Sequence, residues 1–575
     1  MNARHLPSFS FRPRLLDSLK HYTRADLAAD IPAGITVGIV ALPLALAFGI
    51  ASGVRPEQGL MAAIIGGFIV SALGGSKVQI GGPAGAFVAL MYAIAEKYGV
   101  ANLLIATIMA GVLLFAMGAL KLGNLVRFIP VSIIIGFTAG IAVIIGLSQV
   151  KDILGLAIDK MPSNFFSQLS TLGKSLHTVN PAAVMIALSS FLLILLWPVA
   201  YKENASRWRR IVAKLPSTLI VLIVPAVVVW FFDIRVETIG SKFGALPQGL
   251  PMPRIPSFDW ATAQNLVAPT LAIALLAAIE SLLCARMADG MIDDRHDPNQ
   301  ELMAQGIANF FSPWFGGIAV TGTIARTVTN IRTGGRTPVA GMVHALVLLI
   351  VLVAAAPLAA HIPLAALAAI LLWVAFNMVD WGEFARLKQF SLFYRVTLIS
   401  TFLLTVIFDL VVAVEVGLVL SSLFFIYRIS TLTKVDEVAL PPETTALPDG
   451  RRVGAWTLYG SLFFGSVTKL ENLLDPGRKL PDIVILEMDH VINLDTTGLD
   501  ALKSLLKSQR KHGGELIIAG AQAQPLSLMN RDGFADTLGA GNVVKSMNAA
   551  LTRAEEMATA AAPARHVSPD AAEGA

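Results

Sequence analysis

The stretch Val320–Gly335, VTGTIARTVTNIRTGG, decides the fold because it interrupts a strongly apolar chain with threonines, closing glycines and a central Arg326. It is too short to cross a bilayer, which takes about 20 residues, but it fits a half-helix of about 10–13 residues. Irregular backbone at membrane depth is tolerated only where it is buried in protein or lines a cavity. A charged side chain at that depth marks a functional site.

A second interrupted stretch, Val78–Phe87 (VQIGGPAGAF), lies far upstream in an equally apolar part of the chain. Paired broken segments in the two halves of a chain are the best sequence indication of a transporter's binding site. The two stretches therefore predict a substrate site at mid-membrane.

Composition places the chain among polytopic membrane proteins. Of 575 residues, 55% are hydrophobic and 14% charged, and the mean hydropathy is +0.68. A single cysteine, Cys284, excludes a disulfide framework and a cysteine zinc cluster. We find no nucleophile–base set, so an enzyme is not expected, and neither is a cofactor, a metal or a nucleic-acid partner.

Apolar runs from Ile31 to about Tyr427 predict a transport domain at 31–430, after an N-terminal segment at 1–30. Fourteen membrane segments are expected, in two halves at about 31–232 and 266–428: 31–51, 57–73, 83–95, 101–120, 129–147, 181–200, 216–232, 266–286, 299–312, 323–333, 338–356, 362–378, 395–409 and 411–428.

The charge distribution predicts the orientation. The N-terminus is basic and lacks the apolar core of a cleavable signal (Arg4, Arg12, Arg14, Lys20 and Arg24). The loop after the sixth segment is also basic, with Lys202, Arg207, Arg209, Arg210 and Lys214 against Glu203 alone. By the positive-inside rule both lie in the cytoplasm, so both termini are expected there and the loop 233–265 outside, in an inner membrane.

An internal repeat supports the division into halves. The run 55–62 resembles 297–304, and Ile65, Phe68, Gly74 and Gly75 match Ile307, Phe310, Gly316 and Gly317 at the same offset. Seven segments separate the copies, so an odd number inverts one copy relative to the other. With a one-residue gap Gly81 falls on Gly322 and Gly85 on Arg326, which makes the two broken stretches structural equivalents facing each other across a pseudo-two-fold axis.

The broken stretches have the chemistry of an anion site. A helix that starts at mid-membrane exposes unpaired N–H groups and a partial positive charge, and Gly82-Pro83 suits such a start. Small residues at Ala84, Gly85 and Ala325 let an anion approach the backbone, and Arg326 adds positive potential. The alternative is that these small residues only allow close helix packing.

Glu280, in Leu275–Leu283, is taken as the only acidic residue well inside an apolar segment apart from Glu415. A buried carboxylate either pairs with a cation or takes a proton. Glu280 is therefore a candidate for proton coupling, with a static ion pair to Arg326 as the alternative.

Beyond Arg428 the chain becomes more polar, and residues 436–556 alternate as in a soluble α/β domain. Strands are expected at Val453–Tyr459, Ile483–Met488 and Glu515–Ala519, with helices at Thr497–Ser508 and Val543–Met557. The Ala/Pro-rich end, 558–575, is predicted to be disordered.

These residues resemble the SulP family of anion transporters, the sulfate permeases. The resemblance rests on 42–49 (LPLALAFG), 81–86 (GGPAGA), 278–282 (AIESL) and 326–330 (RTVTN), the last running into 333–337 (TGGRT). Membership implies fourteen spans in a seven-plus-seven inverted repeat, core and gate subdomains, an elevator-like movement of the core and a homodimer.

By position the resemblance assigns the anion site to Leu44 and Phe48, to Ala84 and Gly85, and to Ala325 and Arg326. The expected helix start adds Gly82 and Pro83 to the candidate substrate-binding residues. Several members carry Gln where Leu44 stands and Ser where Ala325 stands, so this chain keeps backbone N–H groups and Arg326. Sodium-coupled bicarbonate members have Asp and Thr where Glu280 and Cys284 lie. Glutamate and a thiol make a poor sodium site, which favours proton coupling.

The tail resembles a STAS domain, the fold of anti-sigma-factor antagonists, and its 495–498 stretch (DTTG) stands where those proteins carry a phosphorylatable DSSG. Thr496 and Thr497 are therefore candidate regulatory residues, and the domain a candidate docking site for a cytoplasmic protein. The alternative is that the loop only caps the following helix.

Together these features predict a secondary active anion transporter, most simply a proton-coupled symporter of sulfate or a similar dianion. A bicarbonate or chloride transporter or exchanger, an anion channel or voltage-sensing relative, and a purine or pyrimidine carrier of the same architecture remain alternatives. Glu280 argues against a channel, which needs no proton acceptor, and Arg326 and the STAS tail argue against the nucleobase carrier.

Overall fold

The computed structural model describes residues 11–124, 130–158, 160–197, 216–257, 259–408, 410–471, 480–539 and 541–560. The basic loop at 202–214, on which the predicted orientation partly rests, and residues 561–575 of the predicted disordered tail lie outside the described residues. The chain forms two compact units, Met1–Leu418 and Val419–Ala575.

A helix occurs at each of the fourteen predicted membrane segments. In the first half these are α2 (Arg24–Ala51), α3 (Pro56–Met61) continued through η1 (Ala62–Gly66) into α4 (Gly67–Leu73), α5 (Phe87–Tyr98), α6 (Val100–Ala119), α7 (Val131–Ile153), α9 (Pro181–Leu196) and α11 (Ser217–Phe232). In the second half they are α14 (Val267–Ile292), α15 (Pro298–Phe311), α16 (Ile324–Arg332), α17 (Pro338–Ala359), α18 (Leu364–Met378), α20 (Leu392–Ile407) and α21 (Leu410–Leu432).

Within the described ranges, seven helices are long and apolar enough to cross a membrane, or up to eight if the bent pair at Phe165–Thr178 and Pro181–Leu196 is one span. Several other predicted spans are shorter apolar helices, among them α11, α18 and α20. Fourteen crossings thus stay a prediction. Further short helices lie between the predicted segments: α1 (Arg14–Lys20), α8 (Phe165–Ser175), α12 (Ile239–Phe243), α13 (Trp260–Asn265) and α19 (Trp381–Ala385).

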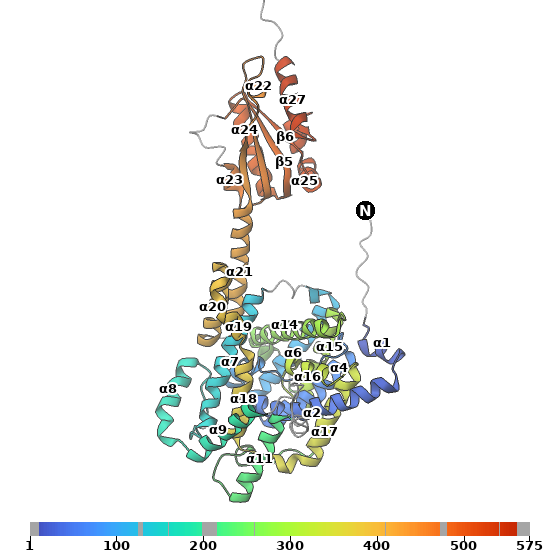
Figure 1. The fold of residues 1–575 in the computed structure, drawn as a ribbon, viewed down its shortest axis with the longest axis vertical. Helices are drawn as coiled ribbons and strands as arrows, with labels where there is room; N and C mark the ends of the chain where they lie inside the picture. Colours follow the sequence, from blue (N-terminus) through green and yellow to red (C-terminus); the bar gives the residue numbers. More distant parts are fainter. Residues whose placement is uncertain are drawn as a thin grey trace, which may run out of the picture. The chain divides into compact units, whose positions relative to one another are not determined.

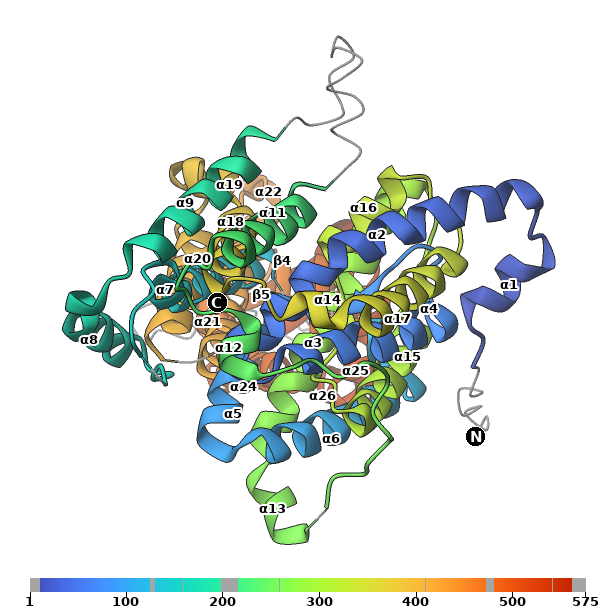
Figure 2. The same ribbon diagram turned by 90° about the horizontal axis from the view of Figure 1, so that it is seen from below.

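The helices of the first unit form two groups. In the core group α2 packs along α17, α15 along α6, α14 against α6 and α16, and α5 against α6 and α2. In the gate group α7 packs along α18 and α20, while α9 contacts α18 and α11. Figure 2 shows α7, α9 and α20 on the left and α2, α4 and α17 on the right. These groups correspond to the core and gate subdomains that the resemblance implies.

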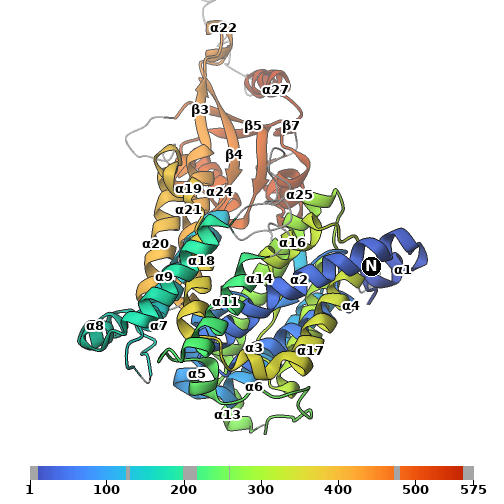
Figure 3. The same cartoon turned by 60° about the horizontal axis from the view of Figure 1, so that its bottom comes forward.

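Two very short strands cross at the centre of the core group. β1 (Gly81–Gly82) and β2 (Thr321–Gly322) pair antiparallel, with Gly81 opposite Gly322. Figure 3 shows α16, which follows β2, beside α2 and α14. Pairing of Gly81 with Gly322 is what a two-fold axis through the crossing requires of equivalent residues, in accord with the predicted alignment of the repeat.

Side-chain bonds repeat across the same centre. Gln58 and Gln300, which occupy matching places in the internal repeat, each reach the loop that follows the other copy. Gln58 Nε2 donates to the Gly316 carbonyl at 3.0 Å, and Gln300 Nε2 donates to the Leu73 carbonyl at 2.7 Å. The sequence repeat thus has a counterpart in paired contacts, while the full seven-plus-seven inversion stays a prediction.

The N-terminal helix α1 is fixed to the core group. The Arg14 backbone N–H donates to the Gly74 carbonyl at 2.9 Å, and Asp294 accepts ion pairs from Arg14 at 3.0 Å and Lys77 at 2.9 Å. Partial burial opposes ionisation of Asp294, but the bonds from Lys77, the Arg295 backbone and Arg14 outweigh it and hold its pKa below the usual value.

The second unit is a sheet with helices on both faces (Figure 1). The strand order is β3 (Lys434–Val438), β4 (Val453–Leu462), β5 (Ile483–Leu494), β6 (Glu515–Ala519) and β7 (Val543–Val544), parallel except for the β3–β4 pair. Alternation along β5 sends Val484 and Leu486 into the cluster with α24 (Thr496–Lys511), and Ile483 and Ile485 into the cluster with α27 (Met547–Ala560).

Two details of the tail prediction are wrong. Val543–Val544 form strand β7 rather than the start of a helix, because their N–H and C=O groups pair with β6; α27 begins only at Met547. The predicted start at 436 falls inside β3, whose antiparallel partner β4 could not be inferred from local sequence. Helices α25 (Ala523–Asp532) and α26 (Phe534–Leu538) were not predicted.

Candidate functional site

The first turn of α16 has free backbone donors. Its N-cap, Thr323, does not cap the helix, because Thr323 Oγ1 donates instead to the Ile80 carbonyl at 3.0 Å. The N–H groups of Ile324, Ala325 and Arg326 have no hydrogen-bond acceptor in the described part of the chain. Ile324 is 50% exposed and Ala325 is exposed. An anion can therefore reach this helix terminus from the open side.

The other broken stretch differs from its prediction. Gly82-Pro83 does not start the helix: residues 83–84 lie outside regular secondary structure, and α5 begins at Phe87 after a turn in which Phe87 N donates to Ala84 O. Gly82 lies in β1 and pairs with β2, so the helix begins later in the chain than predicted. The N-cap Ala86 has no side-chain oxygen, but the N–H groups of Phe87 and Val88 donate to the Ala84 and Gly85 carbonyls, so the first turn of α5 has fewer free donors than that of α16.

Several predicted site residues meet around Gly85. A Cβ placed there would lie 3.5 Å from the Phe48 ring of α2 and 3.1 Å from the Met378 sulfur of α18. Leu44 lies one turn before Phe48 on α2, and Ala84 adjoins Gly85; all three are buried. This contact thus joins α2 and the turn before α5 to a residue of the gate group. Met378 was not predicted, since no local signal marks it.

Arg326 is not an open ligand in this conformation. It is 1% exposed, and its Nη2 donates to the Pro83 carbonyl at 3.3 Å. A Cβ on Gly82 would lie 2.0 Å from Nη1, which itself has no acceptor. The guanidinium therefore lies against 82–83, where only a glycine leaves room, and its charge supports the site from behind the backbone.

Hydrogen bonds hold α16 against the opposite stretch and against α14. Thr327 Oγ1 accepts from Ile80 N at 3.0 Å and lies 3.3 Å from Cys284 Sγ. Asn330 Nδ2 donates to the Val78 carbonyl at 2.8 Å. These bonds satisfy backbone groups of Val78 and Ile80, which lie outside helices and strands. Buried backbone groups need such partners.

Glu280 lies on α14, one turn before Cys284; its side chain is partly exposed, but its Oε2 atom is buried and has no hydrogen-bond partner among the described residues. Neither Glu280 nor Arg326 takes part in an ion pair within the described ranges, so the alternative of a static Glu280–Arg326 pair is wrong. The reason is geometric, since the guanidinium turns to the Pro83 carbonyl. Glu280 is left as an isolated carboxyl beside the crossing.

Two further acidic side chains of the described residues are fully buried, but they lie near the starts of their helices rather than well inside a predicted segment. Glu301 of α15 is fully buried and accepts from the Gly75 backbone at 2.9 Å, Ser281 Oγ at 3.2 Å and Gln305 Nε2 at 3.0 Å. Asp30 of α2 is also fully buried and accepts from the backbone N–H of Arg336 and Thr337. Both carboxylates tie helix termini together, whereas Glu280 has a free oxygen.

Gln79 is a buried residue that sequence reasoning missed. Its Nε2 donates to Ser281 Oγ at 2.9 Å, while its Oε1 has no partner in the described ranges. The Gln79 side chain packs against Gly322, where an added Cβ would collide with Nε2. A polar residue inside the broken stretch 78–87 was the available signal.

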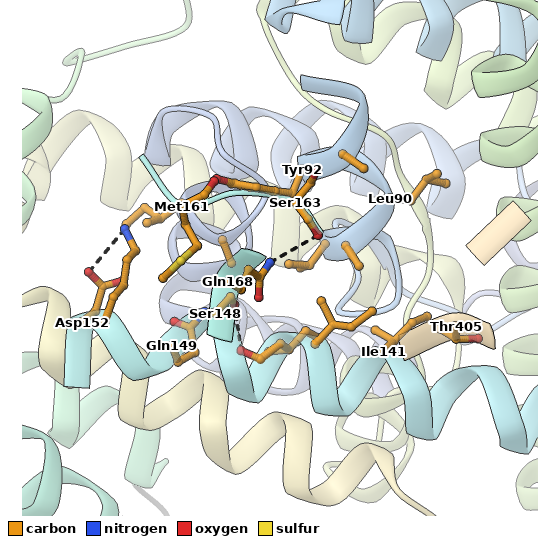
Figure 4. Close-up of a pocket in the computed structure, with 18 of the residues that line it drawn as sticks. Leu90, Tyr92, Ile141, Ser148, Gln149, Asp152, Met161, Ser163, Gln168 and Thr405 are labelled. Carbon is orange, nitrogen blue, oxygen red and sulfur yellow. Dashed lines mark hydrogen bonds and ion pairs between the residues drawn. The ribbon is translucent and has the colours of Figure 1, made fainter. Parts of the chain in front are cut away.

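A cavity of about 100 Å³ lies between the two helix groups, one turn beyond the Phe48–Gly85 contact. Core residues Ile50, Val88 and Tyr92 face gate residues Ile141, Ser148 and Gln168 across it. In Figure 4, Asp152 and Met161 lie toward one end, and Leu90 and Thr405 toward the other.

The candidate regulatory threonines lie in the second unit. Thr496 and Thr497 are exposed at the start of α24, where Asp495 is the N-cap and accepts from Gly498 N at 2.8 Å. Capping is thus performed by Asp495, and both threonine hydroxyls stay accessible. Phosphorylation of Thr496 or Thr497 stays a prediction, and the capping by Asp495 does not block it.

Comparison with known proteins gives the class. Residues 27–401 match the model of the sulfate permease family, and residues 450–550 match the STAS domain. The chain is 41% identical over 490 residues to YvdB, a putative sulfate transporter of Bacillus subtilis (strain 168), covering 85% of this chain and 90% of that protein.

A bicarbonate transporter of Synechocystis, BicA, is 32% identical over 486 residues, covering 81% of this chain and 83% of that protein. The murine Slc26a9 anion transporter in its inward-facing state superposes with a TM-score of 0.83 at 20% identity, covering 96% and 97% of the two chains, which supports the fold.

The chain belongs to the sulfate permease family. It is a multi-pass membrane transporter with a C-terminal STAS domain and not an enzyme. Groups of three or more His, Cys, Asp or Glu side chains that could hold a metal ion are not found among the described residues.

Proposed function

We propose that the protein is a secondary active transporter that moves one proton together with one dianion, sulfate or a dicarboxylate. The observation that carries this proposal is the uncapped first turn of α16, whose free N–H groups adjoin the exposed Ala325. An anion held by backbone donors needs no side-chain ligand. Leu44 and Ala325 offer none.

Charge matching supports a dianion. Two uncapped helix N-termini, of α5 and α16, each contribute roughly half a positive charge. Arg326 adds a full charge behind the Gly82-Pro83 backbone. While Glu280 is protonated it carries no charge. The sum of about two positive charges then balances the charge of a dianion better than that of chloride.

Proton coupling follows from the isolation of Glu280. Glu280 has no ion-pair partner among the described residues, so ionising a carboxyl whose Oε2 is buried is costly, and protonation and anion binding support each other. Loss of the proton lowers the local charge to about one and favours release of the dianion. The core group would carry the site past the gate group in an elevator-like movement, within a homodimer whose termini lie in the cytoplasm.

Competition at the purified protein tests the proposal. At low pH, sulfate, fumarate and succinate are expected to displace labelled sulfate at concentrations at least about tenfold lower than chloride or bicarbonate, since a second charge gains about 1.4 kcal/mol or more. Equal displacement by chloride and sulfate at one concentration contradicts the charge-matching argument.

Bicarbonate transport is the second candidate, because BicA proteins are among the relatives at over 30% identity. The same panel separates the two. Displacement by bicarbonate but not by sulfate, independent of a proton gradient, would favour this candidate over proton–dianion symport.

We propose that the STAS domain is regulatory, with Thr496 and Thr497 as sites of modification or of docking for a cytoplasmic protein. Deleting residues 436–575 is expected to lower transport or surface expression several-fold without changing which anions are carried. The cut falls inside β3, so it removes the rest of the sheet with its own hydrophobic clusters and none of the candidate anion-site residues. Measured inhibition constants for the anion panel check this, and an altered order of preference refutes it.

A further inference from the structure

Two hydrogen bonds join the core group to the gate group at one end of α5. Tyr92 Oη donates to the Met161 carbonyl, and Glu96 Oε2 accepts from the Ser163 backbone N–H at 3.0 Å. Tyr92 and Glu96 stand one helical turn apart on a core helix. Met161 and Ser163 belong to the connection 154–164, which leaves α7 of the gate group.

The same contact closes the cavity of Figure 4. Core residues Ala51, Ala89 and Tyr92 form one wall, and gate residues Ser148 and Gln168 form the other. At about 100 Å³ the space holds about three waters. Gln168 is 3% exposed, and its Oε1 is a buried acceptor without a partner among the described residues, as expected beside a hydrated space.

The cavity lies beside the candidate anion site. A Cβ on Gly85 would lie 3.5 Å from the Phe48 ring, and Ile50 and Val88, a few residues further along the chain from Phe48 and Gly85, line the cavity. Beyond it α2 and α7 end, at Ala51 and Ile153. The cavity thus lies between the anion site and the face of the protein where these helices end.

We propose that this cavity is the closed outer half of the anion pathway, and that Tyr92 and Glu96 form the latch that keeps it closed. The inference rests on the proposed transport function, because a latch between two groups has meaning only where they move past each other. A hydrogen bond of about 3 Å is lost when its partners separate by an ångström or two, so sliding of the core breaks both bonds together.

Gly53 gives the latch its shape. A Cβ at that position would lie 2.9 Å from the Tyr92 ring, and its φ of +74° is one that favours glycine. The ring is thus held between the end of α2 and the gate connection, which aims its hydroxyl at the Met161 carbonyl.

The test measures opening without measuring transport. Ala89→Cys places a thiol in the cavity wall, and its rate of reaction with a maleimide is followed in the purified full-length protein. The native Cys284 is buried, so the parent protein supplies the background rate. After that background is subtracted, adding Tyr92→Phe or Glu96→Gln is expected to raise the labelling rate about 2- to 10-fold over that of Ala89→Cys alone, the range of one lost hydrogen bond, and adding both raises it by the product.

Tyr98→Phe is the matched control, since it removes the same hydroxyl at the last residue of α5, from a tyrosine whose hydroxyl makes no hydrogen bond to Met161 in the described part of the chain. It is expected to leave the rate unchanged. Tyr92→Phe removes a single oxygen atom, and an unchanged elution profile and Tm confirm that it folds.

Unchanged labelling in Tyr92→Phe, Glu96→Gln and the double variant would overturn the latch, and so would an equal rise in Tyr98→Phe. If labelling rises as expected while the protein carries no dianion, the latch stands and the proposed substrate fails. If dianion transport is found while labelling does not change, the proposed function stands and the latch fails.

Discussion

Arg326→Ala is expected to weaken anion binding by about 10- to 150-fold, the range for one lost charge-assisted interaction of about 1.5–3 kcal/mol. Arg326 is the buried cation at the crossing, 1% exposed and in contact with the Gly82-Pro83 backbone. Alanine removes positive potential beneath both helix N-termini while leaving the backbone donors in place. Titration calorimetry or thermal shift with sulfate measures the loss.

The matched control is Arg332→Ala, which removes the same charge from the exposed, C-terminal end of the same helix. We expect it to bind sulfate within about twofold of the parent, since a surface charge at a distance is screened by solvent and salt. Parent-like affinity in Arg326→Ala, or an equal loss in Arg332→Ala, would contradict the assignment of the site.

Arg326→Ala is also expected to keep the fold. Within the described ranges the Nη1 atom has no acceptor, and Nη2 makes a single bond to a carbonyl, so the change breaks no ion pair there. Strands β1 and β2 and the bonds from Thr327 and Asn330 still hold the crossing. A monodisperse elution profile equal to that of the parent protein separates a binding defect from misfolding.

Glu280→Gln is expected to abolish proton-driven accumulation while preserving exchange of labelled for unlabelled anion. Symport of one proton allows about tenfold accumulation per pH unit, because one unit is worth about 1.4 kcal/mol. The amide is a permanent copy of the protonated carboxyl, so the site keeps its charge but cannot release the proton. Uptake into proteoliposomes with and without an imposed pH gradient measures the ratio.

Glu301→Gln distinguishes the two buried carboxylates. Glu301 accepts three hydrogen bonds from its surroundings, whereas Glu280 Oε2 accepts none from the described residues, so Glu301 is expected to stabilise the fold without setting the coupling. If accumulation driven by the pH gradient survives in Glu280→Gln and disappears in Glu301→Gln, proton coupling belongs to Glu301 instead.

Much of this molecule could be predicted because its signals are local. The apolar runs, set by bilayer thickness, locate helices at all fourteen expected segments, with ends that differ by several residues. Interruption of those runs at 78–87 and 320–335 marked the crossing, and the repeat predicted that Gly81 and Gly322 are equivalent. Alternation of apolar residues likewise located β4, β5 and β6 of the STAS domain.

Other features depended on the tertiary structure, because they are contacts between distant segments. Helix α5 begins at Phe87 rather than at the predicted Gly82-Pro83, because Gly82 pairs with β2. The alternative Arg326–Glu280 pair does not form, because the arginine is held by the Pro83 carbonyl from the opposite stretch. Burial of Glu301 and the contact between Met378 and Gly85 likewise follow from packing.

What the sequence predicts and what only the structure shows therefore differ in how far apart along the chain the interacting residues lie. Hydrophobic runs, helix-breaking residues and a repeat are properties of neighbouring residues, so the sequence alone determined the class of protein, the two halves and the place of the candidate anion site. Which donor is left free, which carboxyl lacks a partner and which core residue bonds to the gate are decided by hydrogen bonds between distant segments. The hydrogen bonds from Thr323 to the Ile80 carbonyl and from Tyr92 to the Met161 carbonyl form only when those distant segments pack together.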